Sequence, residues 1–176
     1  RLAADTSSPD WSAPASWAPG WWAAASSMSG GAPRATATET IGLATGIVNV
    51  YSRSPALLAQ TAATLDEVSD GRFRLGIGPS GPAVIENWHG MEFGNPLRRT
   101  REYVDVIKTV LAGEELEYDG EYFDVPGPHG CEPSPQRTPV LYQAGSSDRG
   151  RAFAAEHAEA VFLSQPNEEA VREYIA

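Results

Sequence analysis

The segment from Val68 to Gly90 constrains the fold most, because it joins a turn, a short strand and a glycine-rich loop. Its sequence is VSDGRFRLGIGPSGPAVIENWHG, in which Asp70-Gly71 forms the turn. Residues 72–77 alternate Phe, Leu and Ile with Arg and Gly, a period typical of a strand. Residues 78–82, GPSGP, are too rich in glycine and proline to continue a strand or a helix. Such a loop after a parallel strand commonly binds ligands in α/β proteins, so we expect a ligand there.

Strands and helices alternate along the rest of the chain. Besides residues 72–77, short apolar runs that predict strands occupy residues 41–48, 139–143 and 160–163. Helices are predicted to begin at Ser54-Pro55, Asn95-Pro96 and Ser147 and near residue 167, because the first two join a capping side chain to proline. The order βαβ(insertion)αβαβα is typical of an α/β fold with a parallel sheet.

Two further features concern the segment from residue 95 to residue 120. The charged side chains of the helix that ends at Gly113 predict an ordinary solvated face. They are Arg98, Arg99, Arg101, Glu102, Asp105 and Lys108. Asp119-Gly120 then predicts a hairpin turn.

Composition excludes several classes of function. The net charge of -10 argues against sequence-independent binding of nucleic acid, which requires a surplus of basic side chains. Cys131 is the one cysteine, which excludes an internal disulfide and favours a reducing compartment. No run has the length of a membrane span or of a signal-peptide core, so the expected location is the cytoplasm. His89, His129 and His157 form no metal-ligand spacing, and no metal is expected.

Residues 1–35 differ from the rest of the chain. They hold four tryptophans among Ala, Ser, Pro and Gly, without a helical or strand period. The pattern predicts an irregular, disordered leader, followed by one domain over residues 36–176.

Two turns at predicted strand ends are candidate binding sites. In the first, Gly78 allows close approach of a ligand and Ser80 offers a hydroxyl. In the second, Gly145, Ser146 and Ser147 precede a helix, whose free amides and dipole favour a phosphate. Turn glycines and capping serines are also common structural features, so both interpretations stay open for each turn. His89 is the candidate for a substrate contact or catalytic role.

Long stretches of the sequence resemble a known family. TATETIGLATGIVNVYSRSPALLAQTAATLDEVSDGRFRLGIG is similar to the third strand, third helix and fourth strand of the luciferase-like flavin oxidoreductases, which are TIM barrels. GPSGPAVIENWHGMEFGNPLRRTREYVDVIKTVL resembles the branch that uses coenzyme F420, a deazaflavin, so residues 36–125 resemble that branch. DVPGPHGCEPSPQRTPVLYQAGSSDRGRAFAAEHAEAVF, within residues 124–163, resembles the FMN-dependent nitrilotriacetate and dibenzothiophene-sulfone monooxygenases.

The resemblance implies roles for particular residues. Gly46-Ile47 would be a cis peptide that forms a bulge behind the flavin ring, and Asn49 would lie near the edge of that ring. Gly145, Ser146 and Ser147 would hold the flavin phosphate. The loop from Gly78 to His89 would form the wall between cofactor and substrate.

The resemblance also implies the chemistry. Either reduced FMN and oxygen would oxygenate a small organic substrate, with a separate flavin reductase, or F420 would exchange a hydride with the substrate. The resemblance further implies a homodimer. The alternative is a catalytically incompetent flavin-binding or interaction fragment.

The match to the family is partial. A TIM barrel has eight strands and about 250 residues, whereas this chain supplies what resemble strands three to six, with an insertion after strand four. We therefore expect a partial barrel encoded by a gene fragment, and a leader read out of frame is one explanation of residues 1–35.

Overall fold

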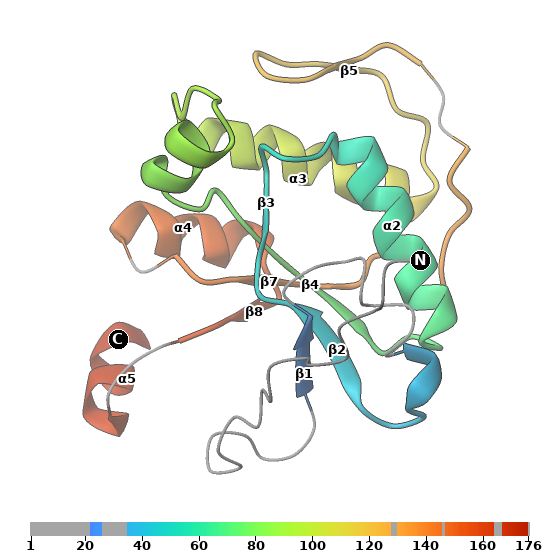
Figure 1. Cartoon of the computed structure of the whole chain (residues 1–176), viewed down its shortest axis with the longest axis horizontal. Helices are drawn as coiled ribbons and strands as arrows, with labels where there is room; N and C mark the ends of the chain where they lie inside the picture. The colour runs from blue at the N-terminus through green and yellow to red at the C-terminus, as the bar shows by residue number, and fades with distance from the viewer. Residues whose placement is uncertain (1–21, 26–34, 128–129, 146, 164–166, 176) are drawn as a thin grey trace, which may run out of the picture.

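The computed structural model describes residues 22–25, 35–127, 130–145, 147–163 and 167–175. A parallel sheet has the order β1-β2-β4-β7-β8, and β3 pairs with β4 beyond β2. The strands of this sheet are β1 (Trp22–Ala25), β2 (Gly42–Thr45), β3 (Val48–Asn49), β4 (Phe73–Gly78), β7 (Val140–Gln143) and β8 (Ala160–Val161). The sequence therefore predicted the α/β class and the parallel sheet correctly (Figure 1).

Helices follow the strands in the predicted order. They are α2 (Pro55–Val68), α3 (Pro96–Ala112), α4 (Asp148–His157), α5 (Glu168–Ile175) and the π-helix η2 (Ala83–Trp88). Ser54 and Asn95 cap α2 and α3 by accepting hydrogen bonds from the amides of Leu57 and Arg98, as the sequence predicted. The predicted hairpin is also present, as β5 (Tyr118–Asp119) and β6 (Asp124–Val125).

Three elements differ from the sequence prediction. β1 lies within the predicted leader and pairs in parallel with β2 over Trp22–Ala25. The run 41–48 forms two strands instead of one, since the chain changes direction at Gly46. The loop after β4 contains η2, which is anchored by the fully buried side chain of Ile85. The division of the chain at residue 35 remains a prediction.

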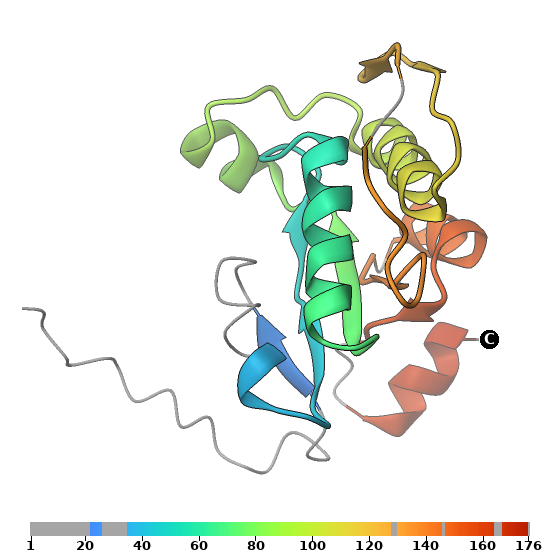
Figure 2. The ribbon, with the colours of Figure 1, turned by 90° about the vertical axis from the view of Figure 1, so that its right-hand side faces the viewer.

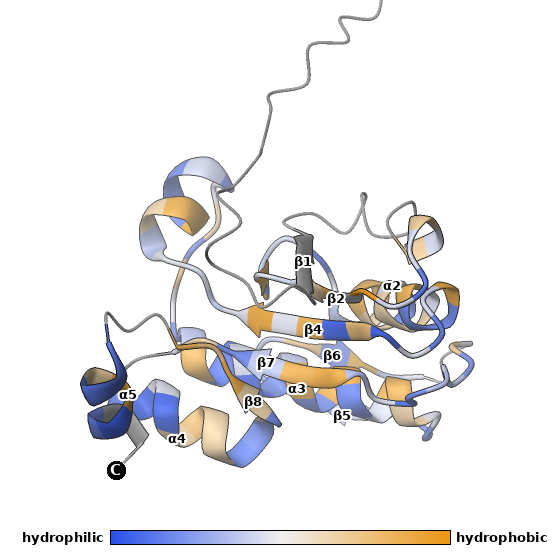
Figure 3. Cartoon of the chain, turned by 90° about the horizontal axis from the view of Figure 1, so that it is seen from below, coloured by the Kyte–Doolittle hydropathy of each residue, from blue (hydrophilic) through white to orange (hydrophobic). Residues whose placement is uncertain are grey.

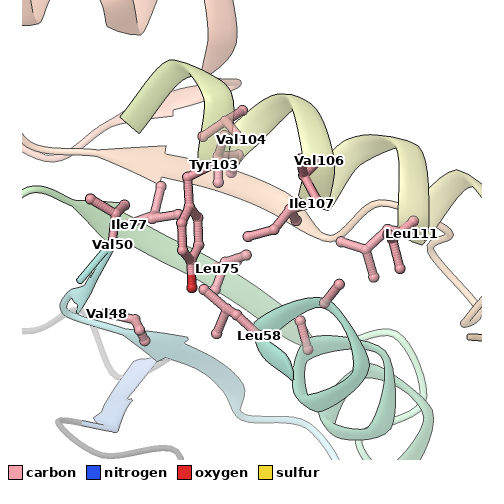
Figure 4. Packing of buried hydrophobic residues seen from close by; sticks show 14 of the residues in the cluster. Val48, Val50, Leu58, Leu75, Ile77, Tyr103, Val104, Val106, Ile107 and Leu111 are labelled. Atoms are coloured by element: carbon pink, nitrogen blue, oxygen red, sulfur yellow. The ribbon is translucent and has the colours of Figure 1, made fainter. Parts of the chain in front are cut away.

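The hydrophobic core fills the space between the sheet and the helices. α2 lies in front of the sheet in Figure 2, and α3 and α4 continue the helical layer along the same side (Figure 3). Leu75 and Ile77 of β4 point toward Tyr103 and Ile107 of α3 and toward Leu58 of α2, and all five are at most 2% exposed (Figure 4). Because side chains of a strand alternate between its two faces, Gly76 and Gly78 lie on the face opposite the helices.

β2 and β4 approach each other closely at Thr45 and Gly76. The hydroxyl of Thr45 donates to the carbonyl oxygen of Gly76 and accepts from its amide, both at 2.8 Å. A Cβ atom on Gly76 would lie 2.0 Å from the carbonyl oxygen of Thr45, which is a backbone atom and cannot rotate away. The contact therefore requires glycine at this position.

We predict that Gly76→Ala lowers the free energy of unfolding by about 3 kcal/mol or more, because the strands must separate to admit the methyl group. Gly81→Ala is the control, since a Cβ atom there meets nothing within 4 Å. Chemical denaturation of both variants measures the difference. Equal stability of the two would contradict the close contact between β2 and β4.

Candidate functional site

The predicted cofactor residues gather at one edge of the sheet. Gly46 and Ile47 follow β2, Asn49 ends β3, Gly78 ends β4 and Gly145 follows β7. The strands are parallel, so their carboxyl ends share this edge, and Asn49 is paired directly with Gly78. The structure thus brings together three segments that are distant in sequence: residues 46–49, Gly78 and Gly145.

The Gly46-Ile47 peptide bond is cis, as the family resemblance implied. The side chain of Ile47 covers the glycines of β4, because a Cβ atom on either Gly76 or Gly78 would lie 3.6 Å from an Ile47 side-chain carbon. Gly76 and Gly78 are consequently buried, and half-buried Ile47 presents an apolar surface at the strand ends.

Asn49 has a fixed orientation. Its Oδ1 accepts hydrogen bonds from the amides of Tyr51 at 3.0 Å and Ser52 at 2.8 Å. Two N–H donors at this atom identify it as the oxygen of the side-chain amide. Within the described residues Nδ2 has no hydrogen-bond partner, so the group that Asn49 offers to a ligand is a donor.

In the turn after β7, more hydrogen-bonding groups are already engaged within the protein than the sequence indicated. The amide of Gly145 donates to Oε1 of Gln143 at 2.6 Å, so this N–H is already engaged. Ser147 caps α4 by accepting from the amide of Gly150 at 3.1 Å, and its hydroxyl hydrogen remains able to donate. Ser146 lies outside the described residues.

Two charged residues at this turn were missed by the sequence reasoning. Asp148 occupies the first turn of α4, and its carboxylate is 93% exposed and paired with Arg151 at 2.6 Å. A carboxylate at a helix N-terminus competes with a phosphate for the positive end of the dipole. The side chain of Arg149 is exposed and has no ion-pair partner among the described residues. The sequence order Ser-Asp-Arg was the available signal for both.

The loop after β4 presents polar and aromatic groups to solvent. Ser80 is exposed and has a positive φ of 63°. His89 is also exposed, and its ring stacks on Trp88 with centroids 5.6 Å apart. No hydrogen bond or ion pair joins the His89 side chain to other described residues, so a catalytic role for His89 stays a prediction. His129 lies outside the described residues, and within them no group of three potential metal ligands occurs.

The first two turns of α3 do not form the solvated face that the sequence predicted. Glu102 is only 5% exposed and accepts hydrogen bonds from the amides of Tyr122 at 2.8 Å and Glu121 at 3.2 Å, and from Nε of Arg98 at 3.2 Å. Arg99 is half-buried beneath the same hairpin turn. These contacts join residues about twenty positions apart, which helical periodicity alone does not reveal.

A surface cleft of about 640 Å³ lies between α3, α4 and the hairpin. Its charged lining residues are Arg98, Glu102, Arg101, Glu156, Arg149 and Asp119. These charges balance, and none of the predicted cofactor residues lines the cleft. We therefore place the candidate site at the strand ends and not in this cleft.

Known proteins resemble this chain in sequence and in fold. The family model described as luciferase-like monooxygenase matches residues 11–176, which include most of the segment set apart as a leader. The chain belongs to the luciferase-like monooxygenase family. It is 50% identical over 91 residues to a long-chain alkane monooxygenase of Geobacillus thermodenitrificans, covering 50% of the chain and 20% of that protein. It is 30% identical over 165 residues to a dimethyl-sulfide monooxygenase of Hyphomicrobium sulfonivorans, covering 79% and 34%.

A solved family structure confirms the partial barrel. The coenzyme F420-dependent tetrahydromethanopterin reductase of Methanopyrus kandleri superposes with a TM-score of 0.70 at 30% identity, covering 76% of this chain and 43% of the reductase. The chain thus spans less than half of these relatives, and its sheet is part of a TIM barrel. Among the described helices, none has the length and apolar character needed to cross a membrane.

The buried carboxylate of Glu102 predicts how the stability of the fold depends on pH. Burial opposes its charge, but the amide of Tyr122, the guanidinium of Arg98 and the amide of Glu121 outweigh burial and hold the pKa of Glu102 below its usual 4.5. Its contribution to stability is therefore complete above pH 4.5 and is lost as the pH falls through the lowered pKa. We expect Glu102→Gln to be about 1 to 3 kcal/mol less stable at neutral pH and to show a weaker loss of stability in acid.

Denaturation between pH 3 and pH 7, a range set about the ordinary glutamate pKa, measures this effect. Glu117→Gln is the control, since Glu117 is an exposed carboxylate next to the same hairpin. Parallel acid profiles for wild type and Glu102→Gln would contradict the role assigned to Glu102.

Proposed function

We propose that this chain is a flavin-binding part of a luciferase-like oxidoreductase that acts on a small organic substrate. The observation that supports the proposal best is the convergence of Gly46-Ile47, Asn49, Gly78 and the Gly145 turn at one sheet edge in a chain of this family. The sequence resemblance implies flavin-binding roles for Gly46-Ile47, Asn49 and the Gly145 turn, and it implies that the loop from Gly78 forms the wall between cofactor and substrate. The cofactor would supply either oxygen activation, as reduced FMN, or hydride transfer, as F420.

The residues at this edge fit a flavin in three respects. Ile47 offers an apolar surface against which a planar ring packs. Asn49 offers an N–H donor for a ring carbonyl or nitrogen. The hydroxyl of Ser147 donates toward a phosphate at the N-terminus of α4. Asp148, in the first turn of α4, opposes the phosphate.

Both cofactors remain candidates. The F420-dependent reductase of Methanopyrus kandleri supports the deazaflavin, whereas the resemblance of residues 124–163 supports FMN. Titration of the chain with each compound, followed by cofactor fluorescence, discriminates between them. We expect one to bind at least about tenfold more tightly, a difference of about 1.4 kcal/mol. Failure of both to bind would reject flavin binding by this chain and, of the alternatives, would leave the interaction fragment.

The remaining proposals concern the cell and the partners. We propose a cytoplasmic location, supported by the single cysteine, and a homodimer, supported only by the family resemblance. A separate flavin reductase is proposed if FMN is the cofactor. His89 and the loop from Gly78 are proposed to face the substrate, supported by their position after β4.

We predict that Ser147→Ala weakens binding of the phosphorylated flavin FMN about three- to tenfold and leaves riboflavin binding unchanged, because riboflavin lacks the phosphate. Ser54→Ala is the matched control. Ser54 also caps a helix through its hydroxyl, so both variants lose about 1 kcal/mol of stability while only one alters the Gly145 turn. Equal weakening of FMN and riboflavin would show that the serine acts only as a cap.

A further inference from the structure

Arg99 is a half-buried cation. It lies in the second turn of α3, and within the described residues no carboxylate is within ion-pair distance of its guanidinium. Three aromatic rings surround it instead, with centroids 4.6 Å away in Tyr51, 5.0 Å in Phe123 and 5.4 Å in Tyr122. Such contacts are stronger when the cation is shielded from water. Arg99 thus holds together side chains from two separate segments.

One of these segments is the loop that contains Asn49. Nε of Arg99 donates to the carbonyl oxygen of Val50 at 3.2 Å, while the amide of Val50 donates to Gly78 at the end of β4. The ring of the next residue, Tyr51, lies against the guanidinium, and the amide of Tyr51 donates a hydrogen bond to Oδ1 of Asn49. Arg99 is therefore separated from the Asn49 side chain by a single residue that it contacts directly.

Further contacts hold Tyr51 in place. Its ring stacks on Phe93 with centroids 5.6 Å apart, and its hydroxyl donates to the Phe93 carbonyl oxygen at 2.6 Å. Burial raises the pKa of the Tyr51 phenol above its usual 10, and the charge of Arg99 against the ring partly offsets this increase. Tyr51 is 4% exposed, so it has little freedom to move independently of Arg99.

The second segment is the hairpin turn. Tyr122 and Phe123 contact Arg99, and Glu102, one turn further along α3, accepts the amides of Glu121 and Tyr122. The turn is therefore fixed to the same helix by a charge that is independent of Arg99. Its two rings complete, together with Tyr51, the aromatic enclosure around the guanidinium.

We propose that Arg99 is a positioning residue that fixes the turn at residues 49–52 and so aims Nδ2 of Asn49 at the flavin. The proposal rests on the proposed function for its flavin, but the positioning itself concerns contacts within the chain. Arg99 does not touch the cofactor edge directly. It acts through Val50 and Tyr51, and the hairpin turn keeps it in place.

Arg99→Lys tests the positioning without any cofactor. Lysine keeps the charge but lacks Nε–H and the flat guanidinium that lies against the rings. We expect hydrogen exchange at the amides of Tyr51 and Ser52 to become about fivefold faster, the factor that corresponds to about one hydrogen bond. The control is Arg101→Lys on the same helix, whose exposed ion pair with Glu156 lies outside the enclosure. Unchanged exchange in Arg99→Lys would overturn the proposal.

A double-mutant comparison tests the link to the flavin. We expect Arg99→Lys to weaken flavin binding about fivefold when Asn49 is present and to cause no further loss in an Asn49→Ala background. Equal losses in both backgrounds would indicate a general structural role and overturn the proposal. Absence of flavin binding by wild type would instead reject the proposed function, while the exchange experiment would still decide whether Arg99 positions the turn.

Discussion

The contact between Thr45 and Gly76 determines how the centre of the sheet is built. One hydroxyl bonds both backbone groups of Gly76, so β2 stays attached to β4 at the point where regular pairing between them ends. The chain then changes direction at Gly46-Ile47 and pairs with β4 again through β3. Without the hydroxyl, the amide and carbonyl of Gly76 would lose these buried partners, which is costly.

This arrangement places Ile47 and Asn49, which come from one chain segment, at the carboxyl end of β4. Ile47 reaches the β4 glycines from one side, and Asn49 pairs with the last of them. Gly76 and Gly78 leave room for Ile47, whereas the large apolar residues of β4, Phe73, Leu75 and Ile77, face the helices. The hydrophobic core and the candidate site therefore occupy opposite faces of the same strand, so substitutions at the site need not disturb the core.

Local patterns predicted the parts of the fold that local chemistry controls. Ser54-Pro55 and Asn95-Pro96 marked both long helices correctly, because a cap and a proline act within one turn. β1 was not predicted, since its Trp-Ala-Ala-Ala sequence has no alternation and depends on pairing with β2. The burial of Glu102 was also missed, because its partners come from the hairpin turn. The sequence resemblance identified the position of the cis peptide and the residues that meet at the strand ends. It did not reveal that Oε1 of Gln143 already accepts a hydrogen bond from the amide of Gly145.

The occupied amide of Gly145 changes how a phosphate could be held. A turn with several free N–H groups would bind an anion through its backbone, and glycine would then be needed for access. Here a Cβ atom on Gly145 would lie 3.0 Å from the Cα of Gly150 and 2.5 Å from Nε2 of Gln143, so glycine is needed for packing even without a ligand. The binding energy must then come mainly from the Ser147 hydroxyl and from the free N-terminal amides of α4. Asp148, in the first turn of α4, reduces the attraction of that helix end for an anion.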